Sequence, residues 1–405
     1  MVTEGELLQA LDALLDESVE ARAAAARSAF DTVAGLRRDR VVLLGAGGCG
    51  RRALVGMRHA GAAPLAFADN NPARHGSTID GIPVLSPANA AAQYGDSAVF
   101  VVTIWGANSP HRFAHSRAQL VALGCDVVIP FPLLFWKYPN GTLPHYLQDW
   151  PEQVLTAREA VRDGARLWAD DASRVEYLAQ VRFRLHADFD GLTHPVAHPQ
   201  YFPDDLYAWR ADEWIVDGGA YDGDTLRVLL QRQVPFEHLF ACEPDPVNFA
   251  KLEAMVAALP NGVRARISVH EVALASASGM LHLDARADAS STTQSWAGSD
   301  TVTVDAKPLD RLLAGAVPTL VKLDIEGAEP EALRGARETI VTHAPVLAIC
   351  VYHVQDHLWS IPLMLKSWRD DYAFYLRPHN EEGWDLVCYA VPQSRWITHV
   401  GRIAS

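Results

Sequence analysis

The sequence predicts an α/β protein in which a helical connector joins two doubly wound units. Twice, an apolar run of strand length stops at a glycine-rich turn that leads into a helical pattern, first in RVVLLGAGGCGRRAL from Arg40 and again in WIVDGGAYDGDTL from Trp214. Residues 136–205, which precede the second of these turns, show helical patterns without strand alternation. We therefore expect an N-terminal helix at 1–35, a small Rossmann-like unit at 36–135, a helical connector at 136–205 and a second α/β unit at 206–405.

The composition argues against several classes of protein. With 405 residues, 49% of them hydrophobic, the chain is long enough for two or three domains with proper cores. Its formal net charge of −14 repels polyanions, so we expect neither a nucleic-acid partner nor insertion into a membrane. Five scattered cysteines without CxxC spacing indicate neither a disulfide framework nor a zinc site. No apolar stretch reaches the ~20 residues of a membrane span, and acids stand where a signal peptide has bases, so we expect a cytoplasmic protein.

Residues 3–30 carry a helical pattern. Thr3 can cap the helix, and the early acids Glu4 and Glu6 suit its positive end. Leucines fall on one face of this helix. We expect that face to pack in the core of the chain, and a contact in a homo-oligomer is the alternative.

The first glycine turn has the GxGxxG spacing of a dinucleotide site. Gly45, Gly47 and Gly50 lie between a strand and a helix, and Asp69 ends the next apolar run. The backbone N–H groups at the start of that helix could hold a phosphate or nucleotide. Alternatively, the glycines only permit a tight turn and close packing of helix on strand. Further strands are expected at 98–103 and 126–130, with helices from Pro87 and Arg112.

The connector is expected to form helices at 151–168 and 172–182, followed by the proline-rich loop THPVAHPQYFPDD. His194 and His198 are four residues apart in this loop. The proline between them prevents the helix that would aim both at one metal, so we expect no metal there.

In the second unit, acids end two successive strands. Asp217 follows the apolar run at Trp214, and Glu243 ends the next strand, before a helix that starts near Pro246. A carboxylate at the end of the second strand suits a ribose diol, which presents two hydroxyl donors. The acids Asp217, Asp222 and Asp224 would repel a pyrophosphate. These features favour a nucleoside with a cationic tail, and S-adenosylmethionine fits that description.

Several segments of this unit resemble the FkbM family of S-adenosylmethionine-dependent methyltransferases. They are YFPDDL, DEWIVDGGAYDGDT, LVKLDIEGAEPEALRGARETI, LAICVYHVQDHLWSIPLML and YAFYLRPHN, which together cover roughly residues 200–392. The resemblance implies the class I methyltransferase fold, with a mixed sheet between helices, and methyl transfer usually to a hydroxyl. The first unit, with DNNPARHGSTIDGIPVLSP, is similar to small nucleotide-binding-like domains that precede some FkbM domains and some sugar acyltransferases.

The resemblance and the strand ends together assign a set of residues to the cofactor. Glu243 matches the ribose-binding acid, Asp217 would act through the turn on the amino-acid end, and 271–273 lie where this fold usually holds the adenine. Capping of a helix is the alternative for Asp245. Ser290 to Thr293 resemble a substrate-side loop, with a surface loop as the alternative. The full set is Asp217, Gly218, Gly219, Ala220, Tyr221, Glu243, Pro244, Asp245, Asn248, Glu271, Val272, Ala273 and Asp324.

Catalytic groups are expected where two more strands end. Asp324 and His353 follow the runs LVKL and VLAICV, so they should meet at one edge of a parallel sheet. His353, with an ordinary pKa near ~6.5, would take the hydroxyl proton, while Asp324 or Glu326 would orient it, hold the substrate or ligate a divalent cation such as Mg²⁺. The alternatives are a helix-terminal acid for Glu326 and a hydrogen-bonded strand-end histidine for His353. Arg377 and His379 are further candidates for the substrate side.

The sequence therefore predicts an O-methyltransferase that acts on a hydroxyl of a sugar or similar small polyol, which could be linked to a nucleotide or glycan. A non-catalytic module that binds a nucleotide sugar or dinucleotide is the alternative. An oxidoreductase centred on Gly45 to Asp69 lacks a recognisable hydride-transfer partner in the first unit.

Overall fold

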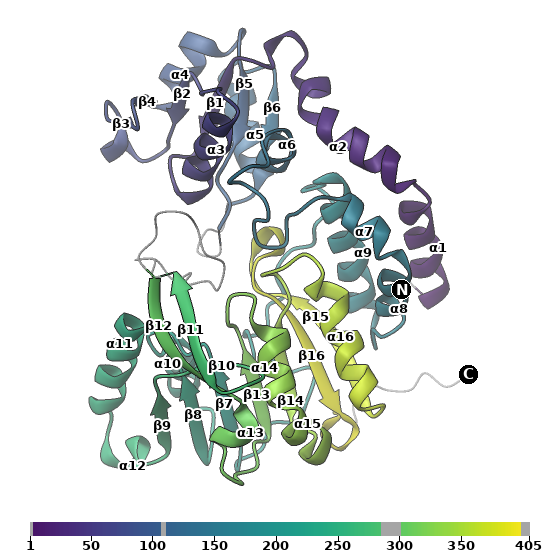
Figure 1. Ribbon diagram of the computed structural model, residues 1–405, viewed down its shortest axis with the longest axis vertical. Coiled ribbons are helices and arrows are strands. Elements are labelled where there is room, and N and C mark those ends of the chain that lie inside the picture. The colour runs from purple at the N-terminus through teal and green to yellow at the C-terminus, as the bar shows by residue number, and fades with distance from the viewer. Residues whose placement is uncertain (1–2, 107–110, 285–300, 398–405) are drawn as a thin grey trace.

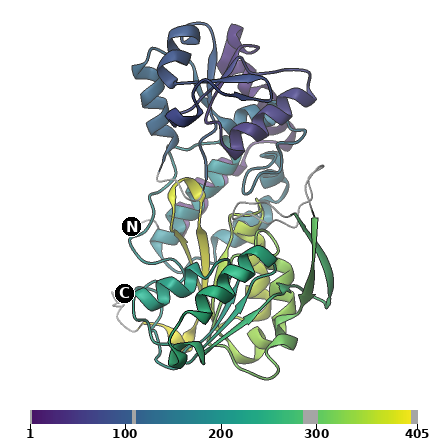
Figure 2. The ribbon, with the colours of Figure 1, turned by 90° about the vertical axis from the view of Figure 1, so that its left-hand side faces the viewer.

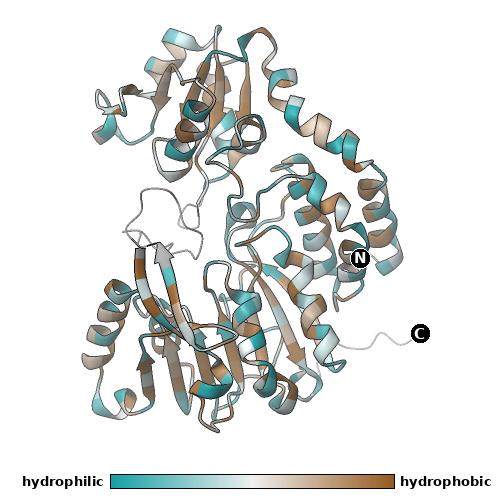
Figure 3. Cartoon of the chain, viewed as in Figure 1, coloured by the Kyte–Doolittle hydropathy of each residue, from teal (hydrophilic) through white to brown (hydrophobic). Residues whose placement is uncertain are grey.

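The computed structural model describes residues 3–106, 111–284 and 301–397. Two α/β units are stacked along the long axis of the molecule, and helices of the connector lie beside them (Figure 1). The predicted fold class, with two doubly wound units, is confirmed. The strands of both sheets are largely hydrophobic, whereas polar residues gather on the helices that cover them (Figure 3).

The N-terminal segment forms two helices where one was predicted, α1 (Glu4–Leu15) and α2 (Val19–Ala34). The chain breaks between them because the side chain of Ser18 accepts a hydrogen bond from the Ala21 N–H at 3.0 Å and so starts a new helix. Leu7, Leu11 and Leu15 of α1 are fully buried, and the helix packs on α8 (Arg158–Ala165) and α9 (Asp171–His186). This apolar face therefore packs within the chain, as expected.

The first unit contains a six-stranded sheet with the order β3-β4-β2-β1-β5-β6. All neighbours are parallel except the short edge hairpin of β3 and β4, which was not predicted because β3 has only two residues and β4 contains Pro83. The strands are β1 (Val41–Leu44), β2 (Ala66–Ala68), β3 (Thr78–Ile79), β4 (Ile82–Leu85), β5 (Val99–Val102) and β6 (Val128–Pro130). The helices are α3 (Gly48–His59), α4 (Pro87–Tyr94) and α5 (Phe113–Ala122), with short 3₁₀ turns at Gly35–Arg37 and Pro72–Arg74.

The connector is helical, as predicted, and then runs as an irregular loop to the second unit. The helix predicted at 151–168 is two short helices that meet at Ala157. Together with α1 and α2, these helices form a layer along one side of the molecule (Figure 1). They are α6 (Phe131–Lys137), α7 (Glu152–Thr156), α8 (Arg158–Ala165) and α9 (Asp171–His186).

The second unit contains a mixed seven-stranded sheet with the order β15-β16-β14-β13-β7-β8-β9. Only β16 runs against its neighbours, so the other strands, β15 included, share one direction. The strands are β7 (Trp214–Gly218), β8 (His238–Cys242), β9 (Ile267–His270), β13 (Leu320–Leu323), β14 (Val346–Cys350), β15 (Tyr372–Pro378) and β16 (Leu386–Pro392). This order brings the ends of β7, β8, β13 and β14 to one edge of the sheet.

A small sheet that was not predicted stands beside the large one (Figure 2). It consists of β10 (Ala273–Leu274), β11 (Gly279–Asp284) and β12 (Thr301–Lys307). The helices of the second unit are α10 (Asp224–Gln231), α11 (Pro246–Ala257), α12 (Asn261–Arg264), α13 (Leu309–Leu312), α14 (Glu329–Gly335), α15 (Arg337–His343) and α16 (His357–Trp368), with 3₁₀ turns at Glu381–Gly383 and Gln393–Arg395. Across the described ranges, no helix combines the length and hydrophobicity of a membrane span.

Candidate active site

The glycine turn after β7 is built by close contact between backbones. Gly219 has a φ of +76°, and a Cβ atom there would lie 1.9 Å from the carbonyl oxygen of Asp324. The N–H groups of Gly219 and Ala220 both donate to the carbonyl of Cys242, at 3.0 Å each. Glycine is therefore required at 219, because the turn packs so closely between the ends of β8 and β13 that no side chain fits there.

A buried ion pair supports this turn from below. Lys322 Nζ lies 2.8 Å from Asp217 Oδ1 and also donates to the carbonyl oxygen of Gly219 at 2.7 Å. Burial opposes the charge on Lys322, but Asp217 and other nearby carboxylates outweigh it and raise the pKa of the ammonium group. Sequence reasoning missed Lys322, although a lysine inside an apolar strand signals a buried partner. Asp217 thus acts on the turn by holding Lys322 beneath it.

The acids of the turn are not open to a cation in the way the sequence suggested. Asp217 is paired with Lys322, and Asp222 forms an ion pair with Arg227. Asp224 accepts a hydrogen bond from the Thr225 N–H at 2.7 Å, at the start of α10. Two of the three acids are therefore paired with cations of the chain, so the turn would repel a pyrophosphate less than the sequence suggested.

Glu243 is a buried carboxylate whose position is fixed by the backbone. Its Oε2 accepts from the Tyr221 N–H at 2.8 Å and its Oε1 accepts from the Asp245 N–H at 2.9 Å. Burial raises the pKa of this carboxyl to about 7, although the two N–H groups oppose the shift. Since each oxygen has a further lone pair, the carboxylate can still accept hydrogen bonds from two neighbouring hydroxyls.

The residues around Glu243 have mixed roles. Asp245 Oδ1 accepts from the N–H groups of Val247 and Asn248 at 2.9 and 3.0 Å, so its capping role is observed. The segment 271–273 follows β9, which is tied to the end of β8 by the Glu243 N–H bond to the His270 carbonyl at 3.0 Å. Val272 and Ala273 are buried there, and Glu271 is exposed. Ser290 to Thr293 lie outside the described residues.

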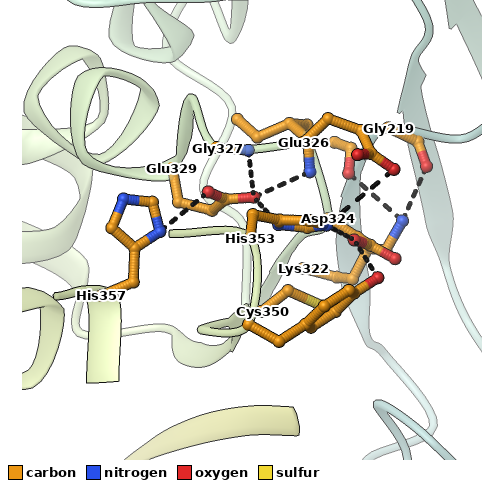
Figure 4. A network of polar contacts seen from close by, with 12 residues as sticks. Gly219, Lys322, Asp324, Glu326, Gly327, Glu329, Cys350, His353 and His357 are labelled. Atoms are coloured by element: carbon orange, nitrogen blue, oxygen red, sulfur yellow. Dashed lines mark hydrogen bonds and ion pairs between the residues drawn. The ribbon is translucent and has the colours of Figure 1, made fainter. Parts of the chain in front are cut away.

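His353 lies within a ring of carboxylates (Figure 4). Its Nδ1 is 2.8 Å from Glu329 Oε1, and its Nε2 is 3.2 Å from Asp324 Oδ1 and 3.9 Å from Glu326 Oε1. The sequence predicted that Asp324 and His353 would meet at this edge, and the structure brings them together. Glu329, the first residue of α14, was missed; it also accepts from the Ile325 N–H at 3.0 Å and so holds the turn between β13 and α14.

The surrounding carboxylates favour the charged form of His353. Burial opposes its charge, but Glu329, Glu326 and Asp324 outweigh burial and raise the pKa of the imidazole well above its usual value. Conversely, burial raises the pKa of Asp324, but His353, Lys322 and Tyr201 outweigh it and lower the pKa overall. The prediction of an ordinary pKa for His353 is therefore wrong, because the neighbouring carboxylates raise it. A raised pKa disfavours His353 as the base, because a protonated imidazole has no lone pair with which to take a proton.

The carboxylates, not the histidine, form the surface of this cluster. The side chains of Asp324 and Glu326 are 24% and 23% exposed, whereas those of His353 and Glu329 are 1% and 0% exposed. Tyr201, from the proline-rich loop, donates to Asp324 Oδ2 at 2.7 Å and was also missed. Asp324 and Glu326 are thus the members of the cluster best placed to meet a substrate.

Arg377 and His379 are engaged within the protein instead of facing the cluster. Arg377 forms an ion pair with Asp170 and donates to Ser173 Oγ at 2.8 Å, which ties the start of α9 to β15. A nitrogen of His379 lies 2.8 Å from the Tyr389 hydroxyl, and burial lowers the pKa of His379 to about 4. Their expected role on the substrate side is therefore not supported by their contacts.

In the first unit, packing accounts for two of the three fingerprint glycines. Gly45 has a φ of +114°, and a Cβ atom on Gly50 would lie 2.0 Å from the Gly45 carbonyl oxygen, whereas Gly47 borders open space. The carboxylate of Asp69 accepts from the Ala46 N–H, the Asn71 N–H and Arg74, at 2.8, 2.8 and 2.9 Å. Asp69 thus closes the glycine turn, and nucleotide binding at this turn stays a prediction.

No group of three or more histidine, cysteine, aspartate or glutamate side chains is arranged to hold a metal ion in the parts of the chain that the structure describes.

Comparison with known proteins relates the second unit to methyltransferases. Residues 217–374 match the family model for the methyltransferase FkbM domain. The fold is similar to that of the methyltransferase FkbM from Methylobacillus flagellatus KT, with a TM-score of 0.73 and 24% identity over 93% of this chain and 99% of that chain. A candidate rRNA methylase from Clostridium thermocellum aligns over 47% of this chain and 90% of its own, with 11% identity and a TM-score of 0.31. A search of curated protein sequences found no significant match.

The matched segment runs from Asp217, the acid at the end of β7, to Phe374 in β15, and so includes the glycine turn, Glu243, Asp324 and His353. The chain therefore carries a methyltransferase domain of the FkbM family.

Proposed function

We propose that this domain uses S-adenosylmethionine to methylate a hydroxyl of a sugar or a similar small polyol. The observation that best supports the proposal is the position of the Glu243 carboxylate, which two backbone N–H groups fix at the end of β8. Each of its oxygens keeps a lone pair that can accept a further hydrogen bond. That geometry matches the two neighbouring hydroxyls of a ribose. When bound, S-adenosylmethionine supplies an electrophilic methyl group on a sulfonium.

Other residues of the edge fit the rest of the cofactor. The glycine turn at Gly218 to Tyr221 lies next to Glu243 and would hold the amino-acid end. Residues 271–273, tied to β8 through β9, would flank the adenine. Lys322 keeps the turn in place from below and so acts on the cofactor only through the backbone.

The acceptor hydroxyl would meet carboxylates. Because the carboxylates raise the pKa of His353, we assign it the role of positioning Asp324 and Glu326 and balancing their charge. A hydroxyl that approaches the cluster donates its hydrogen to a carboxylate oxygen, which takes the proton as the new bond forms. Glu326 has a φ of +56°, a conformation that is uncommon for glutamate and typical of strained functional positions, so we assign this acceptor role to Glu326 with Asp324 beside it.

The test is a methyl-transfer screen. The purified chain is incubated with S-adenosylmethionine and a panel of nucleotide sugars, methyl glycosides and oligosaccharides, and products are analysed by mass spectrometry for one added methyl group. We expect one class of hydroxyl-bearing acceptor to be methylated, and Glu243→Ala to abolish the reaction. Methylation at nitrogen or carbon would contradict the proposed acceptor chemistry. Repeating the reaction in EDTA tests whether a divalent cation takes part, since loss of activity would indicate one. A non-catalytic binding module, the alternative, predicts no transfer to any acceptor.

A further inference from the structure

A strained turn joins β15 to β16 at the catalytic edge. Because Cys350, the last residue of β14, pairs with Val387 at the start of β16, this turn lies beside the end of β14. Glu382 and Asp385 adopt positive φ angles of +57° and +49°. Left-handed backbone is unfavourable at residues other than glycine and persists only where the surroundings impose it. Contacts with neighbouring segments must therefore hold this turn in its conformation.

The first unit supplies those surroundings. Trp105, just after β5, donates from Nε1 to the carbonyl oxygen of Glu382 at 3.2 Å, and the Phe113 N–H donates to the carboxylate of Glu382. Arg112 forms an ion pair with Glu381 at 2.9 Å. Three residues of the Rossmann-like unit thus hold a turn of the methyltransferase domain.

Aromatic rings continue from this junction to the catalytic cluster. The rings of Trp105 and Trp384 have centroids 4.6 Å apart, and Tyr146 from the connector lies 4.6 Å from Trp384 and 6.4 Å from His353. Tyr352 packs between Trp384 and His353, at 5.5 and 4.1 Å. Trp105 and Tyr146 are partly exposed, whereas Trp384 and Tyr352 are buried.

One polar atom in this group has no partner. Trp384 is only 6% exposed, and its indole nitrogen Nε1 is buried. This nitrogen makes no hydrogen bond within the described residues. A buried indole N–H usually has a hydrogen-bond acceptor, so a bound ligand is expected to supply the acceptor here. The Trp384 ring contacts both partly exposed rings and also Tyr352, whose hydroxyl donates to Asp324 Oδ1 at 3.4 Å.

We infer that Trp105, Tyr146 and Trp384 form an acceptor site for a neutral pyranose ring at the junction of the two units. The inference rests on the proposed function. The rings of Trp105 and Tyr146 pack on the C–H face of the sugar, and Trp384 Nε1 donates to one of its oxygens. The adjacent carboxylates Asp324 and Glu326 accept from its hydroxyls and repel an anionic group, so a phosphate cannot occupy this position. The Rossmann-like unit is thereby part of the methyl-transfer site.

Saturation-transfer NMR tests this site without requiring turnover. The full chain, saturated with S-adenosylhomocysteine, is titrated with methyl glucoside, methyl mannoside and methyl galactoside. We expect saturation transfer to the ring C–H protons of at least one pyranoside. Trp105→Ala and Trp384→Ala should weaken its binding roughly tenfold, the scale of one aromatic contact, and Trp384→Phe should weaken it roughly threefold through loss of the N–H donor. Trp396→Ala, an exposed tryptophan beyond the other end of β16, is the matched control and should bind like the wild type.

Two results would overturn the inference: no saturation transfer from the wild type to any of the three pyranosides, or unchanged binding in both Trp105→Ala and Trp384→Ala. Calorimetry with S-adenosylhomocysteine shows whether each variant is folded, and the phenylalanine variants Trp105→Phe and Trp384→Phe replace any alanine variant that is not. Failure of the wild type to bind S-adenosylhomocysteine would contradict the proposed function instead, and the pyranoside titration of the chain alone would still decide the aromatic site.

Discussion

His353 and Glu329 form a buried ion pair, with Nδ1 of the histidine 2.8 Å from Oε1 of the glutamate. Glu329 also binds the backbone of the turn that carries Asp324 and Glu326, so one carboxylate sets both the charge of His353 and the position of the two acids above it. Sequence reasoning placed a base at His353. The ion pair instead raises the pKa of His353, which lies buried beneath an acidic surface.

The first prediction concerns the charge of His353. In the wild type, its ring carbon resonances should show the protonated form at pH 7, because Glu329 and its neighbours raise the pKa. Glu329→Gln removes the closest carboxylate and should shift the titration to lower pH. Heteronuclear NMR with labelled histidine measures both. Glu331→Gln, an exposed acid on the same helix, is the control and should leave the titration unchanged. A wild-type His353 that titrates near ~6.5 would refute the ion-pair assignment.

The second prediction concerns the pH dependence of turnover. With the acceptor that the screen identifies and saturating cofactor, kcat should not fall as the pH drops from 7 to 6, because His353 is already protonated over that range. A free histidine base would lose activity there. His353→Ala should still lower kcat by roughly a hundredfold, since Asp324 and Glu326 lose the cation that positions them. Near-normal turnover in His353→Ala would remove this positioning role.

The third prediction follows from the raised pKa of Glu243, about 7 in the unliganded protein. Ribose hydroxyls donate to the ionised carboxylate, so binding should favour loss of the proton. The affinity for S-adenosylhomocysteine should therefore rise by up to roughly tenfold between pH 6 and pH 8. Glu243→Gln cannot ionise, and calorimetry should find weaker binding that changes little over this range. An equally steep pH dependence in Glu243→Gln would assign the linked proton to another group.

The fourth prediction concerns the glycine turn. Gly219→Ala places a Cβ atom 1.9 Å from the Asp324 carbonyl oxygen and forces a positive φ on alanine. The backbone strain alone costs about 1–2 kcal/mol, and the clash adds to it. Chemical denaturation of Gly219→Ala should show a decrease in the free energy of unfolding of at least this size. Gly262→Ala, where no atom lies within 4 Å of the added Cβ, is the control, and equal stability of the two variants would contradict the turn geometry.

The sequence revealed the parts of the site that depend on local pattern and strand direction. Glu243 and Asp324 follow apolar strands, and parallel strands end at one edge, so their convergence with His353 could be predicted. Lys322, Glu329 and Tyr201 were missed because their roles depend on contacts between elements that are far apart in the sequence. Trp105 and Trp384 meet only because the first unit packs on the β15–β16 turn, and no local pattern reports such a contact.

The break between α1 and α2 shows a different limit. The leucine periodicity of the first helix continues into residues that can also be helical, so the pattern alone favoured one helix over 3–30. Two helices form instead because the side chain of Ser18 caps the second one. The buried leucines of α1 can then pack on the connector independently of α2.

Calorimetric titration of the full chain with S-adenosylhomocysteine tests the central claim most directly, namely that Glu243 holds the ribose of the cofactor at the carboxyl edge of the second sheet. The wild type should bind one equivalent. Glu243→Ala should bind at least roughly tenfold more weakly, since hydrogen bonds to a charged group are worth about 1.5–3 kcal/mol each. Glu237→Ala, an exposed acid just before the other end of β8, should bind like the wild type. No binding by the wild type, or undiminished binding by a folded Glu243→Ala, would contradict the claim.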